Sequence, residues 1–322
     1  MEMIYQEKFN LDHSSAPYFS QQVDVLICGL RADSEKDDRY NHVKRSLKDF
    51  KGKVIYFSTD EDANTLNYEI RKDNGDIIDK QDGLNLIPDL RKFLKQNKFD
   101  ANSVCIDITC LAQPILFLLI KIFLTEIKPK KLFAAYTEPK KYKKNHHLIT
   151  EDEEFELYEK IIGCNYSVPG FAKINREEKE MLIAPFGFER QRLISIFESV
   201  EPKGGLIPIL GFPSFVPGWN LTALYMNYKV ISDAESEQQI RFCEASSPFG
   251  LYRLLKELYD LYGSDYKLLI APLGTRPHSL GAALFATKHK QCHLIYDFPV
   301  EKLFRSEEIL KADIYNLTTY IE

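Results

Sequence analysis

Short apolar runs that alternate with amphipathic, helix-like segments constrain the fold of this chain more than any other feature. The runs are VLICGL, KVIYFS, SVCIDIT and KLFAAYTEP in the first half, and MLIAPFG, GLIPILGF, YKLLIAPLG and HLIYDFP in the second. They lack a polar/apolar alternation, which is typical of strands covered by helices on both faces. We therefore expect an α/β fold made of parallel-sheet, Rossmann-like units in two halves.

The segments between these runs predict the helices. Residues 248–262 place five leucines on one stripe, at the spacing of an amphipathic helix. Further helices are expected over 37–50, 61–72, 84–97, 114–127, 188–200, 220–228 and 277–288, with an edge strand at 314–321.

A charged stretch divides the chain. Residues 140–159, KKYKKNHHLITEDEEFELYE, are first basic and then acidic. We expect an N-terminal half over 1–140, a charged connecting excursion over 141–177 and a C-terminal half over 178–322. Such a run is usually a solvated face, and binding of a partner protein through 140–159 is the alternative.

Composition excludes several classes of protein. The net charge of −5 argues against broad nucleic-acid binding, which needs a basic surface. The N-terminus lacks the pattern of a secretory signal. The most apolar run, 115–124, contains Lys121 and is shorter than the roughly 20 residues of a membrane span. We expect a cytoplasmic protein that does not enter membranes.

The six cysteines form no CxxC pair and most lie in apolar text. We expect small buried side chains rather than a disulfide framework or a zinc site. The sequence indicates no metal and identifies no cofactor. Neither GxGxxG, GxxxxGK[ST], GxSxG nor HExxH occurs, so no dinucleotide, Walker, hydrolase or zincin signature is present.

A short internal repeat locates the strongest candidate site. LIAPFG (182–187) recurs 87 positions later as LIAPLG (269–274). Each copy is a buried strand, an Ala-Pro that ends the ladder and a Gly that permits a tight turn. Because ligands bind at the carboxyl ends of parallel strands, Gly187 and Gly274 should open on one sheet edge as ligand-binding positions.

The residues after the second glycine suit an anion. Pro277 fits the first turn of a helix, whose free N–H groups together with Arg276 would hold a phosphate or carboxylate. Thr275 could cap this helix or donate its hydroxyl to the ligand, and His278 could act as an acid or base. The alternative is a capped helix start with a surface arginine and an exposed loop histidine.

The residues after the first glycine give two weaker candidates. Glu189 could act as an acid or base, or it could simply complement the helix dipole. Arg190 could reach the crevice or pair on the surface.

The N-terminal half offers candidates at three strand ends. Asp107 and Thr109 end one strand, where an Asp suits a metal, a ribose hydroxyl or a proton transfer, or else caps the next helix. Gly29 and Arg31 follow another strand. Tyr136 and Glu138 end a third, where an aromatic ring beside a carboxylate could stack on a base and bind its amino group; core packing and turn chemistry are the alternative.

The segment LIAPLGTRPHSLGAALFA, within residues 268–286, resembles the ligand-contacting segment of CARF-type sensor domains. These are Rossmann-like modules of prokaryotic defence that bind cyclic oligonucleotides, generally as dimers. The resemblance implies Gly274, Thr275 and Arg276 as ligand contacts and a homo-oligomer. No nuclease or helix-turn-helix domain is evident in the sequence, so the resemblance predicts no output activity.

Three hypotheses follow. The first is a binding module for a nucleotide or other phosphorylated ligand, acting as a sensor or subunit in a defence or signalling system. Arg276 and the two glycine loops would then give affinity, and Asp107 and Tyr136 selectivity. The second is a hydrolase or transferase acting on a nucleotide, with Asp107, Glu138 or Glu189 as the acid or base. The third is a protein-interaction subunit without a ligand.

Overall fold

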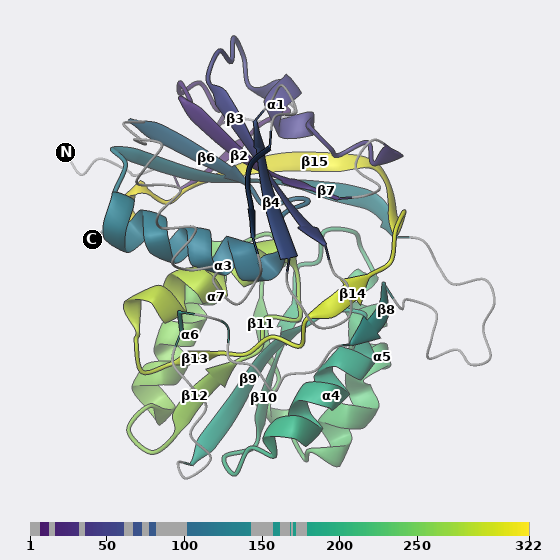
Figure 1. Ribbon diagram of the computed structural model, residues 1–322. Helices are drawn as coiled ribbons and strands as arrows, with labels where there is room; N and C mark the ends of the chain where they lie inside the picture. The colour runs from purple at the N-terminus through teal and green to yellow at the C-terminus, as the bar shows by residue number, and fades with distance from the viewer. Residues whose placement is uncertain are drawn as a thin grey trace. The chain divides into compact units, whose positions relative to one another are not determined.

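The computed structural model describes residues 7–12, 17–31, 36–60, 67–72, 77–81, 102–142, 157–161, 168, 170–171 and 179–321 (Figure 1). The chain divides into two compact units. Unit 1 comprises Met1–Tyr142 and Leu303–Glu322, and unit 2 comprises Lys143–Lys302. Unit 2 is therefore an insertion between two segments of unit 1.

Unit 1 is built on an eight-stranded sheet in the order β1-β15-β7-β6-β2-β3-β4-β5. Its parallel centre consists of β7 (Lys131–Tyr142), β6 (Ser103–Asp107), β2 (Val25–Leu30) and β3 (Lys53–Asp60). Antiparallel strands flank it: β1 (Lys8–Asn10) and β15 (Ser306–Asn316) on one side, and β4 (Asn67–Lys72) and β5 (Ile77–Gln81) on the other. The strand order reverses at β2, between β3 and β6, so the switch point lies between β2 and β6.

In the described part of unit 1, two helical segments follow parallel strands. The first, α1 (His42–Ser46), comes after β2 and contributes Val43 to a core with Leu26, Cys105 and Phe133. The second, α3 (Gln113–Ile122), follows β6, carries Pro114 in its first turn and continues as the π-helix η3 (Phe123–Ile127). Among the described residues, no helix has the length and apolar character needed to cross a membrane.

Unit 2 is built on a parallel five-stranded sheet in the order β11-β10-β9-β12-β13. The strands are β9 (Glu180–Phe186), β10 (Leu206–Gly211), β11 (Arg241–Cys243), β12 (Lys267–Ile270) and β13 (His293–Leu294). The order reverses at β9, so the switch point lies between β9 and β12. Separately, β8 (Tyr158–Ile161) and β14 (Pro299–Glu301) form a two-stranded antiparallel sheet.

Among the described residues of unit 2, four helices cover the sheet. In Figure 1, α4 (Arg190–Val200) and α5 (Trp219–Asp233) lie on one side, and α6 (Pro248–Tyr262) and α7 (Arg276–Lys288) on the other. The described residues also form two short 3₁₀ helices, η5 (Glu237–Gln239) in unit 2 and η6 (Thr318–Tyr320) in unit 1. The core between the sheet and α4 and α5 contains Leu182, Ala184, Leu193, Leu210 and Leu269. The predicted α/β class with two Rossmann-like halves is confirmed: the sheet of unit 2 is parallel, and the sheet of unit 1 has a parallel centre with antiparallel strands on both sides.

The C-terminal residues belong to unit 1 and not to the C-terminal half that the sequence predicts. We expected 178–322 to form one half with an edge strand at 314–321, but β15 joins the sheet of unit 1 between β1 and β7. The boundaries therefore lie after Tyr142 and before Leu303. An antiparallel ladder with β7 fixes this strand. It runs from Asn316↔Phe133 to Ser306↔Tyr142, with a register shift between Ile309 and Lys311, and pairing at such sequence separation leaves no local signal.

The prediction of a helix over 61–72 is wrong for residues 67–72, the part of this range that the structure describes. Residues 67–72 are strand β4, in which the buried Ile70 pairs with Phe57 of β3. Pairing with β3 outweighs local helix propensity here. The helix expected over 37–50 is reduced to the five residues of α1. The helix expected over 84–97 lies outside the described residues.

Candidate functional site

The two copies of the repeat are neighbouring strands in unit 2, and they pair in register. Leu182 pairs with Leu269, and Ile183 with Ile270. Beyond the strands, Leu273 N donates to Pro185 O at 2.9 Å. A Cβ placed on Gly187 would lie 3.3 Å from Leu273 O and 3.9 Å from Gly274 Cα. The two glycine loops therefore touch at the carboxyl edge of the sheet, at its switch point.

Helix α7 begins directly at this edge, and Thr275 is its N-cap. The Thr275 hydroxyl accepts a hydrogen bond from His278 N at 3.3 Å and donates one to Ala245 O at 2.6 Å. Of the two predicted roles, Thr275 thus takes the capping role. Arg276 occupies the first helical position with only 8% of its surface exposed, so the expectation of a surface arginine is wrong.

His278 is buried beneath these loops rather than exposed. Its Nε2 lies 3.1 Å from Glu244 O, so Nε2 carries the proton and Nδ1 is the acceptor. Nδ1 lies beside Gly274, where a Cβ would be 3.1 Å away. Burial lowers the pKa of His278 to about 4. The imidazole is therefore neutral at physiological pH, and it is a poor candidate for a general acid.

Helix α4 begins at the neighbouring strand end with a buried ion-pair network that the sequence did not reveal. Arg192 Nε and Nη2 donate to the two carboxylate oxygens of Asp297 at 2.8 and 2.6 Å. Its Nη1 donates to Glu189 Oε2 at 2.9 Å, and its guanidinium lies 5.3 Å from the Tyr296 ring centre. Glu189 is thus an ion-pair partner of Arg192, and this structural role weakens its case as an acid or base.

Arg190 lies on the outer side of this helix start. It lines a surface cavity of about 490 Å³ with residues of α5: Leu221, Leu224, Tyr225, Met226, Tyr228 and Lys229. The loop at Gly187 is itself tied to α5, because Asn227 Nδ2 donates to Gly187 O at 2.7 Å. Of the two arginines that begin helices at the switch point, Arg276 is the better placed for the glycine loops.

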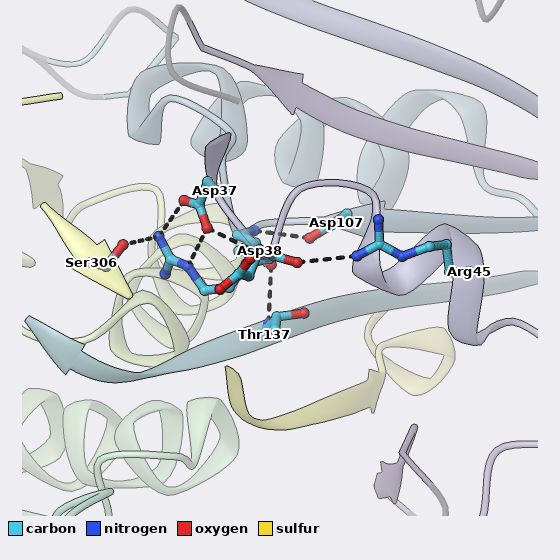
Figure 2. A network of polar contacts seen from close by, with 8 residues as sticks. Asp37, Asp38, Arg45, Asp107, Thr137 and Ser306 are labelled. Carbon is cyan, nitrogen blue, oxygen red and sulfur yellow. Dashed lines mark hydrogen bonds and ion pairs between the residues drawn. The ribbon is translucent and has the colours of Figure 1, made fainter. Parts of the chain in front are cut away.

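Unit 1 carries a separate polar network at the carboxyl edge of its parallel strands (Figure 2). Asp107, at the end of β6, accepts a hydrogen bond from Thr109 N at 3.0 Å, and Thr109 Oγ1 accepts one from Thr137 N at 3.0 Å. The N-cap of α3 is Ala112, so the expectation that Asp107 caps the next helix is wrong. Burial raises the pKa of Asp107 to about 6.

Glu138 on β7 is a second buried carboxyl group. Burial raises its pKa to about 8, against a hydrogen bond from the Tyr136 hydroxyl and the charge of Arg39. Within the described part of the chain, Glu138 Oε2 has no hydrogen-bond partner. Burial also raises the pKa of Tyr136 above its ordinary range. Both groups therefore carry their protons at neutral pH.

Arg39 is the cation of this network, and the sequence did not single it out. Its Nε and Nη2 donate to the two carboxylate oxygens of Asp37 at 3.1 and 2.8 Å, and Nη2 also donates to Ser306 Oγ at 2.6 Å. The guanidinium thereby ties the segment after β2 to β15 (Figure 2). The same segment is held by Arg45, whose Nη2 donates to Asp38 O at 3.1 Å.

Gly29 and Arg31 lie at the end of β2. A Cβ on Gly29 would lie 2.2 Å from the backbone carbonyl of Cys110, so this glycine lets the turn after β6 approach β2. Arg31 is half-buried, and its charge helps to lower the pKa of Asp37, whose main partner is Arg39.

The remaining predictions concern metals and the charged excursion. Among the described residues, no group of three His, Cys, Asp or Glu side chains could hold a metal ion. Lys140 and Lys141 each donate to Glu308 at 2.8 Å, so the start of the basic run has partners within unit 1. Most of 140–159 lies outside the described residues.

Comparison with known proteins adds no relative: no family model, curated protein or solved structure matches this chain.

Proposed function

We propose that unit 2 binds a phosphorylated ligand, of which a nucleotide is the leading class, at the switch point between β9 and β12. The observation that carries this proposal is the contact between the Gly187 and Gly274 loops directly beside the first turn of α7. Ligands of open parallel sheets bind at such switch points, and helix N-termini favour anions.

The chemistry of this edge suits an anion. No acidic residue occupies the first turn of α7, and Arg276 supplies a permanent charge. Since the Thr275 hydroxyl proton is used by Ala245 O, backbone N–H groups and the guanidinium would make the contacts. Small residues at 187 and 274 leave backbone, rather than side chains, facing the ligand.

The resemblance at 268–286 directs the choice of ligand. It favours cyclic oligonucleotides, and with them a sensor role in prokaryotic defence or signalling. Self-association belongs to the same proposal, and light scattering with and without the bound ligand measures it.

The test is calorimetric titration of mononucleotides, cyclic oligonucleotides and sugar phosphates into the wild type and two variants. Arg276→Ala should weaken binding about 10- to 100-fold, because a hydrogen bond to a charged group contributes about 1.5–3 kcal/mol. Arg253→Ala, on the exposed face of α6, is the matched control and should bind as the wild type does. Equal affinity in both variants would refute the site.

A second candidate function belongs to unit 1, and buried carboxyl groups favour it. Asp107 and Glu138 stand near the carboxyl ends of adjacent strands β6 and β7. Burial raises the pKa of Asp107 to about 6 and that of Glu138 to about 8, so at neutral pH Glu138 holds its proton and Asp107 is mostly ionised. Such groups suit general acid–base work, so a hydrolase or transferase acting on a nucleotide is the reaction class.

Product analysis on any nucleotide that binds tests this second function. Asp107→Asn and Glu138→Gln should each abolish turnover and leave affinity within a few-fold of the wild type. Turnover that survives both substitutions would exclude an acid–base role for this pair.

A further inference from the structure

A cavity of about 610 Å³ lies at the opposite, amino edge of the sheet in unit 2. It is formed where β9 and β12 begin, where α6 ends, and by the loop between α7 and β13. The lining residues are Lys179, Tyr259, Gly263, Ser264, Asp265, Tyr266, Lys267, Leu268, Lys290, Gln291 and Cys292. Its volume falls in the range of sites for small molecules, about 300–1,000 Å³.

The charged side chains around this cavity are mostly cationic. Among the described lining residues, Lys179, Lys267 and Lys290 are cationic and Asp265 is the one carboxylate. This local excess of positive charge occurs in a chain whose net charge is −5. Backbone pairing brings two of the lysines together, because Lys267 N donates to Lys179 O at 2.8 Å.

Neutral groups of the cavity add hydrogen-bond donors and apolar walls. The Tyr259 hydroxyl donates to Gln291 Oε1 at 2.8 Å, which leaves the amide nitrogen of Gln291 to donate elsewhere. The Tyr266 ring packs on Gly204, where a Cβ would lie 2.6 Å from Cδ1. A ligand here would meet ammonium and amide donors beside two phenol rings.

We propose that this cavity is a second binding site, for a small ligand with at least two negative charges, such as a phosphorylated or polycarboxylate metabolite. The site goes beyond the function proposed for the switch point. Strand β9 runs from Glu180, which pairs with Lys267, to Phe186 beside Gly187. At about 3.3 Å per strand residue, the two edges of the sheet are therefore about 20 Å apart. One small ligand cannot occupy both sites.

A structural role for the same lysines makes a different prediction. Helices α6 and α7 end near this cavity, and cations stabilise helix C-termini. If the lysines serve only the helix ends, neutralising them lowers the melting temperature without any anion. If they form an anion site, neutralising them removes the rise in melting temperature that a bound anion produces.

The experiment uses the full chain with Arg276→Ala in every sample, so that the proposed switch-point site is weakened throughout. Inorganic pyrophosphate and citrate are titrated calorimetrically into this protein, into one that also carries Lys267→Gln and Lys290→Gln, and into a control that instead carries Lys229→Gln and Lys256→Gln. The control lysines are exposed and do not line the cavity.

We expect one equivalent of at least one probe to bind the Arg276→Ala protein. Affinity should fall at least tenfold in the cavity variant and stay unchanged in the control. Pyrophosphate binding without citrate binding would assign a phosphorylated ligand, and the reverse a polycarboxylate. No binding of either probe, or equal binding by the cavity variant, would overturn the proposal. Loss of nucleotide binding in Arg276→Ala tests the switch point separately.

Discussion

The two units place opposite chemistry at equivalent positions of their sheets. At the carboxyl edge of unit 1, Asp107 and Glu138 are buried carboxyl groups with raised pKa values, about 6 and about 8, and Glu138 retains its proton at neutral pH. At the carboxyl edge of unit 2, glycine loops, Arg276 and the neutral His278 surround a helix N-terminus. Similar strand topology thus supports a proton-holding edge in one unit and an anion-attracting edge in the other.

The difference teaches that topology locates a site while burial decides its charge. In unit 1, desolvation is the largest influence on both carboxyl groups and outweighs the nearby Arg39. In unit 2, desolvation is again the largest influence on His278, but there it removes a proton. Burial favours the neutral form in both units, so their stabilities should respond to pH in opposite directions.

The largest contrast should come from the glycines at the two edges. Gly29→Ala forces a Cβ to within 2.2 Å of the Cys110 backbone, and we expect a loss of about 4 kcal/mol or more of unfolding free energy. Gly187→Ala meets only an atom at 3.3 Å and should cost less than about 1 kcal/mol. Urea unfolding measures both losses. Similar losses would show that the space around the two glycines does not differ as described.

The next effect concerns the buried ion pair of unit 2. Arg192→Ala leaves Asp297, which is fully buried, without its bidentate partner. We expect a loss of about 3 kcal/mol or more. Arg192→Lys should recover only part of it, because an ammonium cannot donate to both oxygens in the same way. A change below about 0.5 kcal/mol in urea unfolding would mean that solvent reaches this pair.

The carboxyl groups of unit 1 predict a stability that falls as pH rises. Folded Glu138 holds its proton to about pH 8, whereas an unfolded Glu loses it near pH 4.3. Its contribution is complete below the unfolded pKa and declines by up to about 1.4 kcal/mol per pH unit as pH approaches 8. Glu138→Gln should flatten this decline in urea unfolding between pH 5 and 8, and the exposed Glu198→Gln should not.

His278 in unit 2 predicts the opposite, over a narrower window. The folded imidazole stays unprotonated down to about pH 4, whereas an unfolded His takes a proton near pH 6.5. Stability should therefore fall as pH drops from 6.5 to 4. His278→Gln, which can still donate to Glu244 O, should reduce this acid sensitivity; an unchanged acid limb would show that other groups dominate it.

The smallest effect should come from the helix cap at Thr275. Thr275→Val removes the acceptor of His278 N and the donor to Ala245 O, at a cost of about 1 kcal/mol. Thr275→Ser should cost only a few tenths. Thermal unfolding without ligand measures this, and equal losses for both variants would deny the hydroxyl a capping role.

Much of unit 2 could be predicted from local patterns. The repeat at 182–187 and 269–274 predicted two loops that open on one edge of a sheet, and the parallel pairing of β9 with β12 confirms it and makes them neighbours. This worked because each copy carries its own strand, stop and turn signals. The alternation of strand-like and helix-like segments was sufficient to predict the α/β class, because each segment also carries its own local signal.

The polar networks could not be predicted, because their partners are distant in sequence. Arg192 and Asp297 are 105 positions apart, and Arg39 and Ser306 are 267 apart. The only local sign was Glu189, three residues before Arg192 on the same helical face. Burial decided the states of Asp107, Glu138 and His278, and no local pattern reports the burial of a single polar side chain.

The insertion of unit 2 between β7 and β15 sets an order of events during synthesis on the ribosome. Lys131–Tyr142 emerges about 160 residues before its partner strand Ser306–Asn316, which is roughly 8–30 s at 5–20 residues per second. Until then the long flank of β7 is an unpaired edge, the type of surface that recruits other chains. An early-folding unit 2 would shorten the effective loop that β15 must close, so delays in its folding should appear as aggregation of nascent unit 1.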